Sequence, residues 1–203
     1  EEMRELKKTQ FPLKYVMLAT GNIDQDVDLA VQAATQGADV IALTRSTAQS
    51  LLDYVPHGET QEGFGGTFAT QANFRRLRAA LDDVSFKQKR FIRLAASTHG
   101  LCMPELAAIV ATEGVDYALN DVLYGTLYRD LNIKRTIVDQ HFSKVLIARA
   151  GVVANTGEEN LMSMGSHADW HPQMLANQFI NEQFAKAAGV RDDLMGIGCT
   201  CEI

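Results

Sequence analysis

Several kinds of residue are scarce in this chain of 203 residues, and each scarcity excludes a class of protein. Three cysteines, Cys102, Cys199 and Cys201, are too few for a disulfide scaffold, and they indicate a reducing compartment, the cytoplasm. Lys and Arg number 19 against 25 Asp and Glu, and a formal net charge of -6 argues against nucleic-acid binding. No apolar run approaches the roughly 18 residues of a membrane span, so we expect no membrane partner.

Residues that bind metals are also sparse, and their spacing does not form a site. Cys199 and Cys201 make a C-x-C without two further ligands at zinc spacing, which favours two small residues inside or lining a barrel. His167 and His171 are four residues apart, but Pro172 argues against a regular helix there and no Glu completes H-E-x-x-H. We therefore expect no metal site.

A repeated pattern is present instead. Short β-branched or apolar runs end in polar residues, and a helix-like stretch follows each of the first five. Strands alternating with helices predict a parallel sheet, and in such sheets ligands bind at the carboxyl ends of the strands. The six predicted strands are Tyr15–Ala19, Val40–Leu43, Phe91–Ala96, Tyr117–Leu119, Val152–Ala154 and Met195–Ile197.

Helical spacing of apolar residues predicts helices over about 24–36, 70–81, 104–113, 134–150 and 174–188. In the second of these, Phe74, Leu77 and Leu81 form the buried face, and its arginines at 75, 76 and 78 are expected to be solvated. The segment 46–70 is rich in glycine and too long for an ordinary strand-to-helix connection, so we expect it to be functional.

Six strand signals and five helical connections leave two folds open. A closed (β/α)8 barrel needs eight strands in roughly 250 residues, and a doubly wound sheet is the alternative. Only Gly21 follows the first strand, so the dinucleotide fingerprint G-x-G-x-x-G is missing. The residues alone predict an α/β barrel-like domain, in which residues 1–12 form a charged extension and 13–203 the barrel portion. The more specific prediction, a (β/α)8 TIM-barrel type with about six strands in this chain, comes from the resemblance described below.

Candidate anion ligands follow the second strand. Arg45 offers a planar fork that matches phosphate or carboxylate, and the Ser50 hydroxyl can complete an anion cradle. A surface salt bridge is an equally compatible role for Arg45. Tyr54 is either a third phosphate donor or a packing residue.

Further candidates follow the later strands. Tyr124 either lies flat against a planar ring or is a half-buried aromatic residue, and Arg129 follows it. His99 is the histidine that stands at a strand end, where either a functional or a structural role is open. Glu158 and Glu159 face opposite ways in an extended stretch, so they do not form an acid–base pair. The residues alone predict an anion site for a small phosphorylated ligand.

Longer segments carry a resemblance to a known family. They are TRSTAQSLLDYVPHGETQEGFGGTFATQANFR, GLCMPE, LYGTLYRDLNIKRT, DQHFS, NTGEEN and QFINEQFA. From about Pro12 to Ile203 the chain resembles the large, barrel-bearing subunit of the D-lysine 5,6-aminomutase and D-ornithine 4,5-aminomutase family. That subunit is longer than this chain, which agrees with six strands instead of eight.

The resemblance implies a (β/α)8 barrel that binds pyridoxal 5′-phosphate. A separate small subunit then brings adenosylcobalamin and the lysine that forms the Schiff base with the cofactor, which makes the enzyme a hetero-oligomer. The implied reaction is a radical 1,2-migration of an amino group on a basic amino acid of the D-lysine, β-lysine or D-ornithine type. The protein would hold the cofactor and shield the radicals.

Individual positions match the family one at a time. Arg45, Ser50 and Tyr54 match residues that hold the cofactor phosphate, and Arg129 matches an arginine that also lies near it. Tyr124 matches the tyrosine that stacks on the pyridine ring, and with Glu159 it is an expected catalytic residue. The roles of Arg45, Ser50, Tyr54 and Tyr124 agree with those inferred above from their chemistry.

Two positions depart from the family pattern. His99 stands where the family usually has a phosphate-binding Ser, and a histidine is larger and titrates near neutrality. Glu159 stands where the family has an Asp near cofactor or substrate, and the stretch LMSMGSHADWHPQ also differs. These departures leave open a paralogue that binds a phosphorylated ligand without aminomutase turnover. An unrelated barrel enzyme of phosphorylated sugars is a third interpretation, although such a ligand needs no stacked ring.

Overall fold

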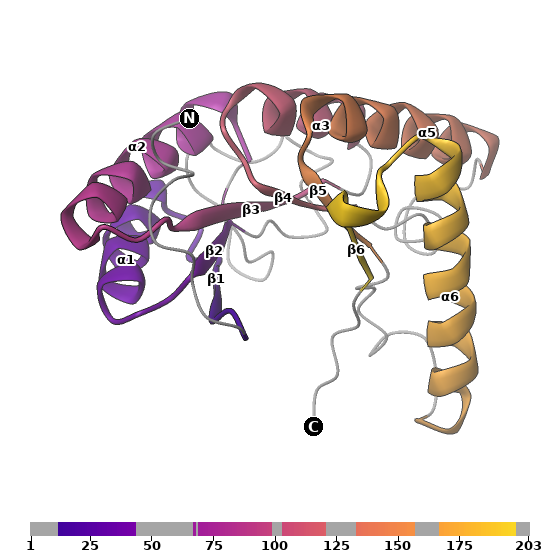
Figure 1. Cartoon of the computed structure of the whole chain (residues 1–203), viewed down its shortest axis with the longest axis horizontal. Coiled ribbons are helices and arrows are strands. Elements are labelled where there is room, and N and C mark those ends of the chain that lie inside the picture. Colours follow the sequence, from indigo (N-terminus) through magenta and orange to yellow (C-terminus); the bar gives the residue numbers. More distant parts are fainter. Residues whose placement is uncertain are drawn as a thin grey trace. The chain divides into compact units, whose positions relative to one another are not determined.

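A computed structural model describes residues 12–43, 67, 69–98, 103–120, 133–156 and 167–197. In these ranges strands alternate with helices, as the sequence predicts, and each predicted strand is present with ends shifted by at most two residues (Figure 1). The elements are β1 Tyr15–Leu18, α1 Ile23–Thr35, β2 Val40–Leu43, α2 Gln71–Gln88, β3 Arg93–Ser97, α3 Met103–Thr112, β4 Tyr117–Leu119, α5 Ile133–Ala150, β5 Val153–Thr156, α6 His167–Ala187, a 3-10 turn Asp192–Leu194, and β6 Met195–Ile197.

The chain forms two compact units, of which the first comprises residues 1–97 and 112–116. Its strands β1, β2 and β3 are paired in parallel, with Tyr15 opposite Val40 and Val40 opposite Arg93. All four residues of the central strand β2 are buried. Helices α1 and α2 pack against each other, and they contact β2 and β3 respectively. A strand enclosed on both sides reads as a continuous apolar run, which explains the sequence VIAL in β2.

Local sequence explains where the two helices of this unit begin. The Asn22 side chain caps α1 by accepting from the backbone N–H of Asp24 at 2.9 Å. The Thr70 hydroxyl caps α2 by accepting from the N–H of Asn73 at 3.2 Å. The predicted buried face of α2 is confirmed, because Phe74, Leu77 and Leu81 are all fully buried. The helix runs seven residues past the predicted end, since residues 84 and 85 continue that face.

One of the three arginines of α2 is not solvated, so that prediction is wrong. The side chains of Arg75 and Arg76 are 64% and 54% exposed, whereas that of Arg78 is 12% exposed. Arg78 donates to Asp82 at 2.6 Å, to Asp116 at 3.3 Å and to the carbonyl oxygen of Ile92 at 3.0 Å. A carboxylate and a carbonyl distant in sequence supply acceptors, so the guanidinium can be buried.

The second unit comprises residues 98–111 and 117–203. Its strands β4, β5 and β6 are also paired in parallel, with Tyr117 opposite Val153 and Ala154 opposite Met195. Helix α5 packs on β5 and α6, and α6 contacts β5 and β6. Across both units, a predicted glycine with positive φ follows each of four helices: Gly37, Gly114, Gly151 and Gly189.

Helix α6 begins at His167, seven residues before the predicted start at 174. The inference that Pro172 prevents a regular helix is therefore wrong. Pro172 is the sixth residue of α6, where its missing N–H removes one helical hydrogen bond near an end whose first N–H groups have no helical acceptor.

Within the ranges that the structure describes, no helix combines the length and apolarity needed to cross a bilayer. The predicted charged extension, residues 1–12, lies outside these ranges except for its last residue, and the predicted long functional segment does so between 46 and 66 and at 68.

Candidate functional site

The predicted ligand-binding residues follow strand ends, and none of their positions is described by the structure. The cysteines lie outside the described residues as well. What the structure shows is the strand ends from which these segments leave. The predicted residues concerned are Arg45, Ser50, Tyr54, His99, Tyr124, Arg129 and Glu159.

At the carboxyl ends of the strands in the second unit, buried polar residues bond to one another. The backbone N–H and the hydroxyl of Thr98 donate to the carbonyl oxygen of Leu119, at 2.7 and 3.0 Å. The side-chain amide of Asn120 donates to the carbonyl oxygen of Thr98 at 2.7 Å, and its backbone N–H donates to that of Asn155 at 2.9 Å. Asn120 therefore links Thr98, the residue after β3, to strand β5.

A lysine from helix α5 completes this arrangement. Lys144 is fully buried, and its Nζ donates to the backbone oxygen of Asn120 at 2.7 Å and to its Oδ1 at 2.6 Å. A third hydrogen bond, of 3.3 Å, runs to Oε1 of Gln140. An ammonium group carries three donors, and these three acceptors match them. We refer to Thr98, Asn120, Gln140 and Lys144 as the strand-end cluster.

A second polar cluster follows β1 in the first unit. The buried carboxylate of Asp26 accepts from the backbone N–H of Thr20 at 3.2 Å and from its hydroxyl at 2.9 Å. The Thr67 hydroxyl donates to the other oxygen of Asp26 and accepts from the N–H of Gly21 at 3.0 Å. These bonds anchor Thr67, near the end of the long predicted functional segment, beside the carboxyl end of β1.

The amino ends of the strands are held differently, by ion pairs. Asp39, just before β2, pairs with Arg90 at 2.6 Å. Asp116, just before β4, pairs with Arg78 and also accepts from the N–H of Leu94 at 2.9 Å. In barrels of alternating strands and helices, the amino-end face serves stability and the carboxyl-end face binds ligands. Thr98 and Asn120 lie at the carboxyl ends of the strands, the side on which barrels of this kind bind ligands.

Several donors converge on the carboxylate of Glu113, in the turn after α3. Arg75 donates to it twice, at 2.7 and 3.0 Å, and the Gln71 amide also donates to it. The hydrogen bond from Arg75, above all, holds the pKa of the Glu113 carboxyl below its usual range, against the opposing effect of desolvation. The turn leads into the amino end of β4, so we assign this pair a structural role.

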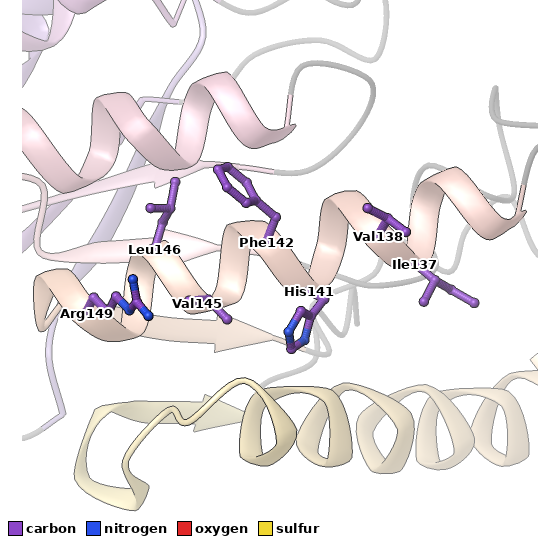
Figure 2. Close-up of a pocket in the computed structure, with 7 residues that line it drawn as sticks. All are labelled: Ile137, Val138, His141, Phe142, Val145, Leu146 and Arg149. Carbon is purple, nitrogen blue, oxygen red and sulfur yellow. The ribbon is translucent and has the colours of Figure 1, made fainter.

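An open hollow on the surface of α5 is not the ligand site. Figure 2 shows that every lining side chain comes from successive turns of this one helix, and none comes from a strand end. Among the described residues, no group of three or more His, Cys, Asp or Glu side chains is placed to hold a metal ion. The residues that line the hollow are Ile137, Val138, His141, Phe142, Val145, Leu146 and Arg149.

Parallel strands alternating with helices, with buried polar residues gathered at the carboxyl ends, define a domain of the α/β-barrel class. Comparison with known proteins names it further. The chain belongs to the family described as "D-Lysine 5,6-aminomutase TIM-barrel domain of alpha subunit", whose model matches residues 1–203. This confirms both the predicted TIM-barrel fold and the resemblance found in the sequence.

Curated relatives agree with the family. The chain is 55% identical over 192 residues to the lysine 5,6-aminomutase alpha subunit of Fusobacterium nucleatum, covering 95% of this chain and 37% of the relative. It is 30% identical to the D-ornithine 4,5-aminomutase subunit beta of Acetoanaerobium sticklandii, covering 89% of this chain and 24% of that protein. The chain thus spans about 37% of the length of the lysine-type relatives.

A solved structure gives the fold independently. A protein of Burkholderia cenocepacia described as a candidate phosphonomutase aligns with a TM-score of 0.53 at 14% identity. The alignment covers 93% of this chain and 68% of that one. At this identity the likeness supports the fold alone.

Sequence reasoning missed Lys144. Residues 140, 144 and 147 of α5 are spaced by four and three, so they share one face of that helix, and all three are fully buried. The signal available in the sequence was a lysine and a glutamine in line with an apolar residue on the buried stripe of a predicted helix. Asn120 directly follows the predicted strand Tyr117–Leu119, and that position alone does not indicate its partners.

Proposed function

We propose that this chain is the pyridoxal-phosphate-binding barrel portion of an enzyme that moves an amino group between adjacent carbons of a basic amino acid. The observation that carries the proposal is the 55% identity to a lysine 5,6-aminomutase alpha subunit over 95% of the chain. The ornithine-type relative is 30% identical, which favours D-lysine or β-lysine over D-ornithine as the substrate.

The chemistry of the candidate residues fits the phosphate of this cofactor. Two guanidinium groups, two hydroxyls and an imidazole are all hydrogen-bond donors, and a phosphate dianion offers only acceptors. The planar ring of Tyr124 fits the planar pyridine. The five donors are Arg45, Ser50, Tyr54, His99 and Arg129.

The order of these residues along the chain supports a common site. Arg45 follows the end of β2 at Leu43 by two residues, and His99 directly follows Thr98. Tyr124 follows the end of β4 by five residues. Segments that leave parallel strands at their carboxyl ends share one face, where barrels of this class bind ligands.

In this proposal the candidate residues have different roles. With both cofactors bound, adenosylcobalamin supplies the radical and pyridoxal phosphate carries the migrating amino group. Arg45 and Arg129 neutralise the phosphate charge and fix the position of the ring. Tyr124 covers one ring face and excludes water from it, which protects reactive species. Glu159 binds the ammonium group of the substrate, and its carboxylate lies one methylene further from the backbone than that of an aspartate would.

The proposal includes a partner. Residues 1–12 form an extension and 13–203 the cofactor-binding portion, while a separate small subunit carries adenosylcobalamin and supplies the Schiff-base lysine. The names of the curated relatives, alpha subunit and subunit beta, support an enzyme built from more than one kind of subunit. The scarcity of cysteine supports placing it in the cytoplasm.

Calorimetry on the folded protein tests the cofactor. We would titrate it with pyridoxal 5′-phosphate, with pyridoxal and with inorganic phosphate. Binding that requires both the ring and the phosphate supports the proposal. Equal binding of inorganic phosphate indicates a general anion site, and no binding of any of the three contradicts the proposal.

A diverged paralogue without turnover is the second candidate, favoured by His99 and Glu159 at positions where the family usually has Ser and Asp. Absorbance of cobalamin in the assembled enzyme distinguishes the two. Spectral change on addition of D-lysine or β-lysine, but not D-ornithine, supports a lysine-type aminomutase. An unchanged spectrum with all three, in protein that binds pyridoxal phosphate, supports the paralogue.

A further inference from the structure

We infer that Lys144 is a positioning residue, which holds Asn120 and, through it, Thr98, the residues from which the segments after β4 and β3 begin. The inference rests on the proposed function, because these segments carry His99 and Tyr124. Lys144 itself lies on α5 and contacts the backbone behind the strand ends.

The geometry gives Lys144 a hold on both parts of Asn120. Its Nζ donates to the backbone oxygen at 2.7 Å and to the side-chain Oδ1 at 2.6 Å, while Gln140 accepts at 3.3 Å. Lys144 and Asn120 are both fully buried, so these hydrogen bonds do not exchange with bulk water. A buried polar group that loses such a partner pays its full desolvation penalty, which keeps Asn120 in one orientation.

The chemistry of its neighbours fixes which way the Asn120 amide points. Lys144 can only donate, so it must face Oδ1, and the carbonyl oxygen of Thr98 can only accept, so it must face Nδ2. Neither an aspartate nor a leucine can satisfy both neighbours. Asparagine is thus the side chain that links the lysine to the backbone of the residue after β3.

The same residue reaches the next strand. The N–H of Asn120 donates to the carbonyl oxygen of Asn155 on β5 at 2.9 Å. A Cβ on Gly196 of β6 would lie 3.0 Å from Oδ1 of Asn155, so the backbone of β6 approaches this side chain closely. A displacement of Asn120 would therefore also move Asn155 of β5 and, through it, the backbone of β6 at Gly196.

Stability alone does not account for a lysine in this position. Replacing a buried charge and its partners by apolar residues of similar volume often leaves stability unchanged or raises it. A buried polar network that is fully satisfied specifies one arrangement of the backbone. At the ligand face of a barrel, one arrangement of the strand ends is what a cofactor site requires.

The test compares three single variants in the assembled enzyme. Lys144→Met removes the donor, and Asn120→Asp keeps the pairing with Lys144 but cannot donate to Thr98. Ser143→Ala is the matched control, since Ser143 is the neighbouring buried residue of α5 and donates to Asp139 of its own helix at 2.7 Å. Asn120→Asp keeps the test valid if Lys144→Met does not fold.

Two readouts are measured. In absorbance titrations with pyridoxal 5′-phosphate, we expect Lys144→Met and Asn120→Asp each to weaken affinity about tenfold or more, and Ser143→Ala to change it less than about twofold. The double variant should bind no more weakly than the weaker single variant, because both residues act through one contact. Without cofactor, amide hydrogen exchange at Thr98 and Asn120 should accelerate in Lys144→Met but not in Ser143→Ala.

A merely structural role predicts another pattern. It would lower the melting temperature of Lys144→Met without changing the affinity of the folded fraction. Wild-type affinity in both single variants, or unchanged exchange at Thr98 and Asn120, overturns the inference. If wild-type protein does not bind pyridoxal phosphate, the proposed function fails, and the exchange measurement alone then decides whether Lys144 holds these strand ends.

Discussion

Arg90 donates to Asp39 at 2.6 Å, and this contact ties together the amino end of the sheet in the first unit. The same guanidinium donates to the carbonyl oxygens of Ala38 at 2.8 Å and Ala34 at 2.7 Å. The second oxygen of Asp39 accepts from the N–H of Lys14 at 2.9 Å. One ion pair therefore joins the entry to β1, the entry to β2 and the end of α1.

Loss of this pair should be costly. Asp39 is almost fully buried, and Asp39→Ala leaves Arg90 without its carboxylate partner and the N–H of Lys14 without its side-chain acceptor. We therefore expect a loss of about 2–4 kcal/mol in unfolding free energy. Asp83→Ala is the control, since Asp83 forms an exposed pair with Lys87 and should change stability by less than about 1 kcal/mol. Urea denaturation measures both, and equal losses would contradict the role given to Asp39.

Glu113 should make stability depend on acid. Its pKa is lowered in the folded protein, chiefly by the hydrogen bond from Arg75, so its contribution is present above the unfolded pKa and is lost as pH falls through the folded value. The melting temperature of Glu113→Gln should thus lie below that of wild type at pH 7, with a difference that shrinks below about pH 4. Glu105→Gln, at an exposed position of α3, is the control. A difference that stays constant between pH 7 and pH 3 would show that the charge is irrelevant.

Gly21 should not accept a side chain without loss. Its φ is +87°, in the left-handed region that side chains disfavour, and its N–H is fixed by Thr67. Gly21→Ala should therefore destabilise the protein by about 1–2 kcal/mol in denaturant titrations. Gln25→Ala, at an exposed position of α1, should change stability by less than about 0.5 kcal/mol. A neutral effect of Gly21→Ala would mean that the turn after β1 adapts to a Cβ.

The stacking role of Tyr124 predicts a difference between two tyrosines. Tyr124→Ala should weaken pyridoxal phosphate binding about tenfold, since a stacked aromatic contributes both buried area and ring contact. Tyr117→Ala, at the amino end of β4, is the matched control and should leave affinity nearly unchanged. Equal effects in calorimetry would indicate that Tyr124 only packs.

The proposed role of His99 predicts tolerance of the family's usual residue. His99→Ser should keep or improve the affinity for pyridoxal phosphate, because a serine hydroxyl also donates to phosphate. Calorimetry measures the affinity of both proteins, and a collapse of binding in His99→Ser would contradict this role.

The strands were predictable because their signals are local. Each is a short apolar run bounded by polar or glycine residues, and Val40–Leu43 was placed without error. Helix ends were less certain. The start of α6 differs from the prediction because a proline near the start of a helix, such as Pro172, does not prevent the helix from forming. Helix α2 continues to Gln88 because the burial of Val84 and Ser85 stabilises the longer helix.

The sequence by itself determined the family, the alternation of strands and helices, and the residue types offered to a phosphorylated cofactor, since these depend on local pattern and composition. Tertiary structure alone decided that the side chain of Arg78 is only 12% exposed, that Asp26 bonds to Thr20 and Thr67, and that Lys144 reaches Asn120. A charged or amide side chain can be buried only where partners distant in sequence supply its hydrogen bonds, and folding alone brings those partners together.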